Sequence, residues 1–478
     1  MNTDYFKMVA EAAFSNPFSE KRVEVDRRIV GAREGTSWKE MQVPLLQSLD
    51  TNIQELEKVG RIVVAPDEGK DAEALAVSIL FYVYHQYAEQ FDLLIEEQIT
   101  AGDESCHAPF AFQCMEKLVN YGFNRADGCR YVSMFYQARR AFYFISTGLI
   151  GDSPSMRGLR AKLWDNIFTH EIAWYVRCLW SRMEDFSTLL LGETGTGKGA
   201  AAAAIGRSGF IPFNPNAKIF DESFTRAFVS INLSQYPESL IESELFGHRK
   251  GAFTGAIEKH DGVFERCSAH GAIFLDEIGD VSVPVQIKLL QVLQERTFSP
   301  VGSHDKIRFN GRVIAATNKS IDALRREGTF RDDFYYRLCS DIITVPPLRQ
   351  RIRETSRELD MLSGHLLKRI CGPELQLPVV ARLKEVVDKN YAWPGNVREL
   401  EQAIRRIMVT GNYEGSSTTE PKDEVALNHA IESGNLSAKE LIRKYCRDLY
   451  DTYGNYGEVA RRTGLDWRTV KKNMTSDN

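Results

Sequence analysis

The sequence predicts an α/β fold with a parallel sheet in the middle of the chain, between two mainly helical regions. From about residue 188, short apolar runs alternate with helix-like stretches: TLLLG, FVSINL, AIFLDE, RVIAATN and DIITVP. Runs this short, bounded by turns and polar residues, are typical of strands buried on both faces of a parallel sheet. Before and after this region, apolar residues recur at helical spacing instead.

The composition is that of a globular chain. Its 478 residues suggest roughly three domains of ordinary size. Hydrophobic residues make up 43% and charged residues 26%, and the formal net charge is −5. A net negative chain is not coated with nucleic acid, so any DNA contact has to come from a local basic patch.

Cysteine usage and the N-terminus both point to the cytoplasm. The eight cysteines form no CxxC pair, which argues against a zinc module, and scattered thiols suit a reducing compartment. The N-terminus lacks the pattern of a secretory signal. The apolar run at 74–84 is about half the ~20 residues that a membrane span needs. We therefore expect a cytoplasmic protein with no membrane contact.

The N-terminal region, residues 1–146, is expected to be mostly helical, with helical spacing over 71–99 and 128–148 and one strand candidate over 60–66. The aromatic run YVSMFYQARRAFYF (131–144) could line a ligand pocket, although a core helix is the more frequent reason for such a run. His107 beside Cys106 is read as structural rather than as a metal ligand.

The segment LLLGETGTGKG is an apolar strand, a glycine-rich turn and the start of a helix. Its spacing, Gly192-x4-Gly197-Lys198, is that of a P-loop, in which backbone N–H groups and the lysine bind phosphates. Gly199 stands where a Ser or Thr hydroxyl often ligates Mg²⁺. The predicted phosphate-binding residues are Gly192, Glu193, Thr194, Gly195, Thr196, Gly197, Lys198 and Gly199.

A second buried strand, in GAIFLDEIGD, ends in two carboxylates. The carboxyl ends of strands line the ligand crevice of open α/β sheets. Asp276 is placed to hold Mg²⁺ through water, and Glu277 to polarise the attacking water in phosphoryl transfer. The P-loop and this strand together predict an ATPase that uses ATP and Mg²⁺.

Further polar residues follow in the same order. Thr317 and Asn318 end the strand RVIAATN, where a neutral amide can orient water or the γ-phosphate. Arg331 and Arg337 lie in FRDDFYYRL; spacing alone favours ordinary surface arginines, but arginine also suits transferred phosphate charge, including from a neighbouring subunit.

The segment WPGNVRELEQAIRRIMV opens a helix. We expect Asn396 to cap it, with Glu399 as its capping partner. Arg398 in the first turn is unfavourable for the helix dipole, which hints at a phosphate partner.

The loop GHRKGAFTGA (247–256) is uncharged over its last six residues, rich in glycine and carries one aromatic residue. Glycines 251 and 255 make it a poor helix and a poor strand. Such a tip is flexible and free of charge, which suits entry into a protein interface. A hairpin packed against its own domain is the alternative.

Together these segments resemble the AAA+ activators of sigma-54 RNA polymerase, the bacterial enhancer-binding proteins. The resemblance is carried by ESELFGHRKGAFTGA, GAIFLDEIGDVSVPVQIKLLQVLQE, FRDDFYYRL, PPLRQR and WPGNVREL, and spans roughly residues 148–410. It implies an AAA+ fold with a helical lid, assembly from dimer to hexamer ring, and ATP-driven remodelling of the sigma-54 closed complex. In the family the GAFTGA tip, here Gly251, Ala252, Phe253, Thr254, Gly255 and Ala256, contacts sigma-54.

The resemblance also implies roles for matching positions. Lys198 binds phosphates, Asp276 Mg²⁺ and Glu277 water. Asn232, in FVSINL, restrains that glutamate and relays the nucleotide state to the loop. Thr317 and Asn318 form the first sensor, Arg398 the second, and Arg331 with Arg337 act between subunits. Position 199 is usually glutamate in this family, so glycine there is unusual.

The chain departs from the family in two stretches and in its first region. Extensions at about 157–186 and 207–227 are longer than we expect, and we place them near the nucleotide or subunit edge. Residues 1–146 occupy the position of the family's sensory domain but match no receiver, GAF or PAS pattern. The expected division is 1–146 regulatory, 147–350 AAA+ α/β, 351–410 lid, 411–435 linker and 436–478 DNA-binding.

The last segment, LSAKELIRKYCRDLYDTYGNYGEVARRTGLDWRTVKKNM, predicts helix, helix, tight turn, helix. Residues 461–474 hold five basic side chains against one acid, a local charge of +4. The segment resembles the Fis-type helix-turn-helix of the same family, which implies binding to double-stranded enhancer DNA as a dimer. The residues expected to face the groove or its phosphates are Arg468, Thr469, Lys471, Lys472 and Asn473.

Three functions follow in order of preference. The first is a DNA-bound ATPase that activates transcription by sigma-54 RNA polymerase. The second is a DNA-binding regulator or repressor on the same scaffold with a vestigial ATPase, which loss of ATP turnover would favour. The third is an AAA+ remodeller of another protein, which failure to bind specific DNA would favour.

Overall fold

The computed structural model describes residues 3–58, 60, 69–372, 376–387, 391–413, 415 and 437–475. It divides into two compact units, Met1–Tyr413 and Glu414–Asn478. The strand expected over 60–66 and most of the expected linker lie outside the described residues.

The centre of the first unit is a five-stranded parallel sheet with the order β4-β5-β8-β1-β9. Its strands are β1 (Thr188–Leu191), β4 (Phe228–Asn232), β5 (Ala272–Asp276), β8 (Arg312–Thr317) and β9 (Asp341–Thr344). They are the five apolar runs of the sequence, and the prediction of a parallel α/β sheet is confirmed. Leu191 pairs with Thr317 and Asn232 with Asp276, so the polar strand ends share one edge.

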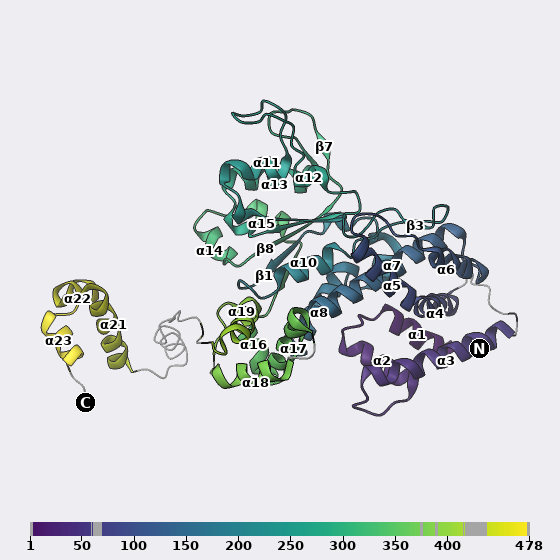
Figure 1. Cartoon of the computed structure of the whole chain (residues 1–478), viewed down its shortest axis with the longest axis horizontal. Coiled ribbons are helices and arrows are strands. Elements are labelled where there is room, and N and C mark those ends of the chain that lie inside the picture. The colour runs from purple at the N-terminus through teal and green to yellow at the C-terminus, as the bar shows by residue number, and fades with distance from the viewer. Residues whose placement is uncertain are drawn as a thin grey trace. The chain divides into compact units, whose positions relative to one another are not determined.

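Successive residues of each strand face two different hydrophobic cores, as the pleat requires. In β8, Ile314 and Ala316 join the core that contains α10 (Lys198–Gly206). Val313 and Ala315 join the opposite core. The second core is covered by α11 (Glu238–Phe246), α12 (Val263–Arg266), α13 (Val283–Glu295) and α15 (Asp332–Leu338). Both faces of the sheet are therefore buried (Figure 1).

Shorter elements connect these strands and helices. They are η3 (Leu233–Gln235), η4 (Ile278–Asp280), the antiparallel pair β6 (Thr297–Phe298) and β7 (Ile307–Arg308), and α14 (Ile321–Arg326). The segments 247–262 and 299–306 extend beyond α11 and α12, away from the sheet (Figure 1).

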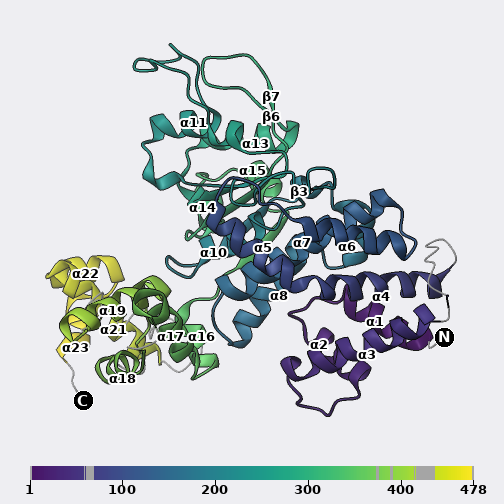
Figure 2. The ribbon, with the colours of Figure 1, turned by 45° about the vertical axis from the view of Figure 1, so that its right-hand side comes forward.

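The N-terminal helices share the first core with the sheet rather than enclosing a separate one. They are α1 (Thr3–Phe14), α2 (Glu20–Val30), α3 (Trp38–Lys58), α4 (Lys70–Gln86), α5 (Ala88–Ala101), α6 (Pro109–Asn120) and α7 (Arg125–Gly148). The helical stretch 71–99 is two helices that meet at Tyr87. Helix α7 runs beside α5, α6 and α10, the helix that follows the P-loop (Figure 2).

The two sequence extensions lie against these N-terminal helices. The first forms α8 (Pro154–Phe168), α9 (Ile172–Trp174), a π-helix η1 (Tyr175–Leu179) and η2 (Met183–Asp185); the second forms the hairpin β2 (Phe213–Asn214) and β3 (Ile219–Phe220). The fully buried Arg140 on α7 donates to the carbonyl oxygens of Arg207 at 2.6 Å and Gly209 at 2.7 Å. Tyr136 stacks on Phe220 with ring centroids 4.1 Å apart. We expected the extensions near the nucleotide or subunit edge; the structure places them at the N-terminal helices.

The lid follows the sheet and has its own core. It consists of α16 (Leu348–Glu354), α17 (Glu358–Cys371), α18 (Gln376–Val386) and α19 (Asn396–Thr410). The expectation that Asn396 caps α19 is wrong, because Asn396 is the buried first residue of the helix with φ of 53° and the cap position is Gly395. Glu399 still turns back, since its carboxylate accepts from the Gly395 N–H at 2.8 Å.

The second unit contains α21 (Ala438–Tyr453), α22 (Tyr456–Thr463) and α23 (Trp467–Thr475), around Cys446, Val459 and Val470. This is the predicted series of three helices. Across both units, no helix among the described residues has the length and apolar character to span a membrane.

Candidate functional site

The P-loop lies between β1 and α10, in the conformation that its glycines allow. Gly195 and Gly197 have φ of 80° and 107°, in the region that glycine adopts most easily. The buried Lys198 turns back over the loop, and its Nζ donates to the carbonyl oxygens of Gly192 at 2.9 Å and Glu193 at 3.3 Å. The Thr196 hydroxyl donates to the Glu193 carbonyl at 2.8 Å. These bonds hold the loop in shape around the lysine.

The two carboxylates follow β5 directly. Glu277 has a left-handed backbone, with φ of 56°, and its N–H donates to Asp276 Oδ1 at 3.1 Å. Burial raises the pKa of Asp276, while the positive charges of Lys198 and Arg398 act in the opposite direction. The lysine of the P-loop and the arginine of the lid are therefore close enough to Asp276 to influence its ionisation.

Asn318 joins the acidic strand end to the P-loop. Its backbone N–H donates to Glu277 Oε2 at 3.2 Å, and its side-chain amide donates to Thr194 Oγ1 at 2.8 Å. The fully buried Thr317 accepts from the Lys319 N–H at 3.1 Å. Glu277, Asn318 and the P-loop thus form one hydrogen-bonded series.

Asn232 is the strand neighbour of Asp276 but is not bonded to Glu277 in this structure. Its Oδ1 accepts from the Ser234 N–H at 3.0 Å and from the Ser234 hydroxyl at 2.8 Å. The carboxylate of Glu277 is instead engaged by Asn318.

The lid is attached to the P-loop by residues that the sequence analysis did not place there. Arg349 binds both carboxylate oxygens of Glu193, at 2.5 and 2.6 Å. The Asn396 amide donates to Glu193 Oε2 and to the Thr194 carbonyl, both at 3.1 Å, and its Oδ1 accepts from the Leu348 N–H at 2.8 Å. The Glu193 side chain therefore faces the lid, and Arg349 followed by Asn396 lowers its pKa. The motifs PPLRQR and WPGNVREL were the only signal for this contact.

A second lid contact was also missed, because nothing in the sequence pairs its partners. Glu358 and Arg351 form a buried ion pair, with Arg351 Nε 2.8 Å from Glu358 Oε1. Glu358 Oε2 accepts from the N–H groups of Asp152 at 2.8 Å and Ser153 at 3.1 Å. This pair fixes the chain segment before α8 to the lid.

The remaining predicted arginines differ in their surroundings. Arg398 is exposed in the first turn of α19, and its side chain makes no hydrogen bond or ion pair with any described residue. Arg331 precedes α15 and forms an ion pair with Asp333 at 2.6 Å. Arg337, in the last turn of α15, donates to the Leu293 carbonyl at 2.9 and 3.0 Å. No hydrogen bond joins Arg331 or Arg337 to the described nucleotide-site residues.

The GAFTGA segment closes on itself and leaves its tip exposed. The Gly251 N–H donates to the Ala256 carbonyl at 2.8 Å, and Ala256 is buried. Phe253 is 39% exposed and touches only the His248 ring, at 4.9 Å, among the aromatic contacts of the described residues. Thr254 is exposed. The tip is therefore partly exposed, while one edge of the Phe253 ring packs against His248 of its own domain.

In the second unit, α23 carries the predicted DNA-facing residues. Arg468, Thr469, Lys471 and Lys472 are exposed, whereas the side chain of Asn473 lies outside the described residues. Arg461 and Arg462 form ion pairs with Glu458, at 2.6 and 2.9 Å, and lower its pKa to about 2. This acid just before the basic segment reduces the local charge.

The P-loop residues could hold the phosphates of a nucleoside triphosphate, and Asp276 could hold Mg²⁺. An added Cβ at Gly197 would meet nothing within 4 Å, so space for phosphate lies above the loop. The N-terminus of α10 and the Lys198 ammonium group supply the positive charge that attracts phosphates. Asp276 supplies the oxygen ligand that Mg²⁺ prefers. Among the described residues there is no group of three or more His, Cys, Asp or Glu that could hold a metal by protein ligands alone.

Comparison with known protein families gives two matches. Residues 177–344 match the sigma-54 interaction domain, and residues 353–423 match the AAA+ ATPase lid domain. The nitrogen fixation protein AnfA of Azotobacter vinelandii is 38% identical over 307 residues, covering 60% of this chain and 52% of that protein.

Two further relatives match over a shorter length. VnfA, also a nitrogen fixation protein of A. vinelandii, is 45% identical over 226 residues, or 47% of this chain and 40% of that protein. The DNA-binding transcriptional regulator NtrC of Azospirillum brasilense is 42% identical over 225 residues, or 47% and 43% of the two chains. The chain spans about half the length of these curated relatives, or less.

Proposed function

Because the chain carries a sigma-54 interaction domain and an AAA+ lid and is homologous to the NtrC and NifA class of activators, we propose that it hydrolyses ATP to activate transcription by sigma-54 RNA polymerase. The observation that carries the proposal is the exposed GAFTGA tip, on the same domain that joins Lys198, Asp276 and Glu277 at one sheet edge.

The chemistry is ATP hydrolysis to ADP and phosphate at the carboxyl edge of the sheet. Lys198, which donates to the P-loop carbonyls in this structure, would bind the phosphates, and Asp276 would hold Mg²⁺. Glu277 orients and polarises the attacking water. Its hydrogen bond to the Asn318 N–H fixes the carboxylate near the P-loop. A two-carboxylate site of this kind works by placing charge and water rather than by covalent catalysis.

The sensing residues report the nucleotide state. Asn318 is hydrogen-bonded to both Thr194 and Glu277, so a displacement of one of them would also shift the other. The unpaired Arg398 guanidinium is available to a phosphate from the lid side. Asn232, with Thr317, completes the strand edge, and a turn of its amide from Ser234 to Glu277 would link the carboxylate to β4 and η3.

Assembly of several chains, from a dimer to a hexameric ring, would complete the site. Among the described residues, Arg331 and Arg337 form no hydrogen bond with their own nucleotide site, and a role on the neighbouring subunit's phosphates would suit them. In such a ring the GAFTGA tips reach sigma-54 within the polymerase. The second unit binds enhancer DNA through Arg468, Thr469, Lys471, Lys472 and Asn473 on α23, the recognition helix.

The decisive experiment is binding of the purified chain to sigma-54 in the presence of ADP–aluminium fluoride. A stable complex with the native chain, and none with Thr254→Ala, is the expected result. Thr254→Ala should hydrolyse ATP at the native rate, because the exposed tip does not contact the P-loop. ATP hydrolysis without a complex would instead favour a remodeller of another protein.

A second experiment separates binding from turnover. Glu277→Ala should retain nucleotide affinity, because Lys198 and the P-loop are unchanged, and should lose at least a hundredfold in ATP turnover. Native turnover in Glu277→Ala would overturn the assigned chemistry. Absence of turnover in the native chain would favour a DNA-binding regulator with a vestigial ATPase.

A further inference from the structure

A cavity of about 510 Å³ lies between the N-terminal helices and the first extension of the nucleotide-binding part. Its walls come from α1, α3, α4 and α7 on one side and from α8, α9 and η1 on the other. The volume lies within the range of roughly 300 to 1,000 Å³ that is usual for small-molecule sites. It is about three times the roughly 150 Å³ that holds one benzene ring.

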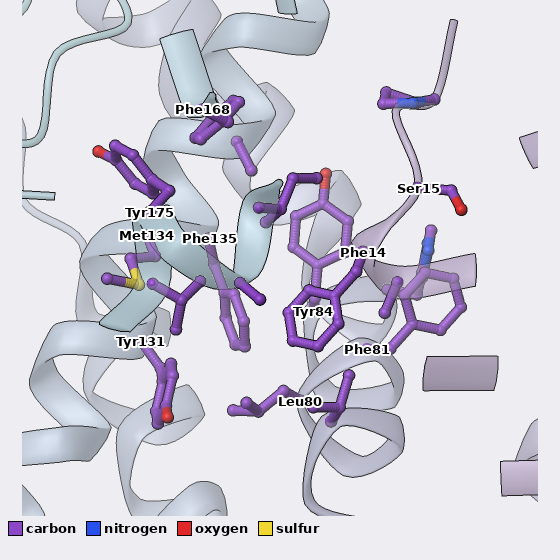
Figure 3. A pocket seen from close by; sticks show the side chains of 18 of the residues that line it. Phe14, Ser15, Leu80, Phe81, Tyr84, Tyr131, Met134, Phe135, Phe168 and Tyr175 are labelled. Atoms are coloured by element: carbon purple, nitrogen blue, oxygen red, sulfur yellow. The ribbon is translucent and has the colours of Figure 1, made fainter. Parts of the chain in front are cut away.

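The walls of the cavity are mainly apolar, and many of their side chains are aromatic. Leu80 and Tyr84 on α4 line it together with Tyr131 and Phe135 on α7, and Phe168 of α8 lies at one end (Figure 3). Tyr84 and Phe135 meet edge to face, with ring centroids 5.5 Å apart. The aromatic run of α7 thus contributes to the cavity as well as to the core around it. Such walls favour ring systems, which stack or meet edge to face with them.

The charged side chains at the cavity already have partners. Arg22 is bound to Asp26 at 2.8 Å and Arg139 to Asp92 at 2.5 Å. A third pair, Arg177 with Glu73 at 2.7 Å, is more exposed and joins the extension to α4. Since these guanidinium groups are balanced, the cavity does not select an anion.

His85 is one of the polar side chains of the wall without a hydrogen-bond partner among the described residues, and the indole N–H of Trp164 is another. The His85 ring touches Phe81 and Tyr84 and makes no hydrogen bond with any described residue. Burial, together with the positive charges of Arg22 and Arg139, lowers the pKa of His85 to about 3. A neutral imidazole has one donor and one acceptor nitrogen, which leaves it able to bind a hydroxyl group.

We propose that this cavity is the effector site of the protein and that it takes an uncharged aromatic molecule of two or three rings with one hydroxyl group, which hydrogen-bonds to His85. The aromatic walls bind the rings, the balanced arginines exclude a requirement for charge, and the neutral imidazole selects the hydroxyl.

The extension connects the cavity to the sheet. Asn166, on the same helix α8 as Phe168, donates to Thr188 Oγ1 at 3.0 Å and to Asp341 Oδ2 at 2.6 Å. Thr188 begins β1, which ends at the P-loop. A ligand that moves α8 therefore acts on the strand that carries the phosphate-binding turn. This regulatory half rests on the proposed ATP hydrolysis; the binding half does not.

The test is equilibrium dialysis of the full chain against 2-naphthol, with 2-methylnaphthalene as the matched ligand without a hydroxyl. One 2-naphthol should bind per chain with a Kd on the order of 10 to 100 µM. Leu80→Trp fills the cavity and should raise that Kd at least about tenfold. Leu93→Trp, on the 61% exposed Leu93 of α5, should leave it within about twofold.

His85→Phe keeps a ring in the wall and tests selectivity even if Leu80→Trp folds poorly. It should raise the Kd of 2-naphthol about fivefold, the worth of one hydrogen bond, and change that of 2-methylnaphthalene less than twofold. Equal binding to the native chain and a folded Leu80→Trp, or no binding at all, would overturn the site. An equal loss of both ligands in His85→Phe would overturn the role of His85.

The coupling is read from ATP turnover. Saturating 2-naphthol should change the turnover rate at least twofold in the native chain and in Leu93→Trp, but not in Leu80→Trp. Bound naphthol with unchanged turnover would refute regulation through α8. A chain that binds naphthol but has no turnover would refute the proposed function and leave the binding site established.

Discussion

The contact between P-loop and lid depends on the amide of Asn396, and Asn396→Asp tests it with minimal change of shape. Aspartate tolerates the left-handed backbone of this position, and its carboxylate can still accept from the Leu348 N–H. What is lost are the two donor contacts, to Glu193 and to the Thr194 carbonyl. In their place a second carboxylate lies beside Glu193.

The expected loss is about 3 kcal/mol. The bond to Glu193 is charge-assisted, but its carboxylate is 41% exposed, so about 1.5 kcal/mol is appropriate, and the carbonyl bond adds about 1. Screened repulsion between the carboxylates supplies the rest. At about 2.1 cal/mol/K per residue, the unit Met1–Tyr413 has an unfolding entropy near 0.9 kcal/mol/K, so Tm should fall by about 3 °C.

The loss of stability in Asn396→Asp should depend on pH, in a direction set by the two carboxylates. In the native chain Arg349 lowers the pKa of Glu193, so its contribution to stability is present above its unfolded pKa and is lost only as pH falls through the lower folded pKa. In Asn396→Asp repulsion raises the folded-state pKa of the pair, so the penalty is complete at high pH and shrinks as pH falls through it.

Scanning fluorimetry at about pH 8 and pH 5 measures both the loss and its pH dependence. The Tm difference between Asn396→Asp and the native chain should be greater at pH 8. Asn396→Ala is the control: it loses the same donors and also strands the buried Leu348 N–H, at a further cost of about 1 to 3 kcal/mol, but adds no carboxylate. An Asp variant that melts with the native chain at pH 8, or by the same margin at both pH values, would refute the reasoning.

Three further predictions concern positions where the structure fixes the outcome. Gly195→Ala should weaken ADP binding at least tenfold in calorimetry, because its Cβ would clash with the carbonyl oxygen of Gly395 in the lid; Gly199→Ala, with nothing within 4 Å, is the matched control and should bind ADP normally. Glu358→Gln should lower the free energy of unfolding by about 3 kcal/mol in urea, since it leaves the buried Arg351 unpaired; an effect below about 1 kcal/mol would contradict the importance of that pair. Arg140→Met should accelerate amide hydrogen exchange over 207–213 at least tenfold, because two carbonyl oxygens lose their donor; unchanged exchange would mean that the hairpin is held by its aromatic contacts alone.

The sequence predicted the sheet and the nucleotide site for the same physical reason. A strand buried on both faces has to be apolar along its whole length, and its polar end has to face the crevice, so LLLGETGTGKG and AIFLDE carry both the strand and its chemistry in a few contiguous residues. The order of the strands in the sheet leaves no comparable local trace.

Contacts between segments that lie far apart in the chain could not be predicted from the sequence. Arg140 donates to carbonyl oxygens 67 and 69 residues away, and backbone acceptors have no side-chain signature. Asn396 was expected to cap its own helix because its chemistry allows that role; the lid instead uses the amide against Glu193, 203 residues earlier. The same distance hid the cavity, since about a quarter of its lining residues come from an extension whose purpose the pattern did not reveal.

The strand β1 explains why these hidden contacts matter together. It has only four residues, Thr188–Leu191, which span roughly 13 Å at about 3.3 Å per residue. At its start Thr188 accepts from Asn166 of the helix that forms one end of the cavity; beyond its last residue the P-loop is tied to the lid through Glu193. Because this short strand is hydrogen-bonded to β8 and β9 along its length, a displacement of one end would be transmitted to the other end. The proposed ligand, through α8, and the lid, through its contact with Glu193, would therefore act on the same short strand, and that strand carries the phosphate-binding turn.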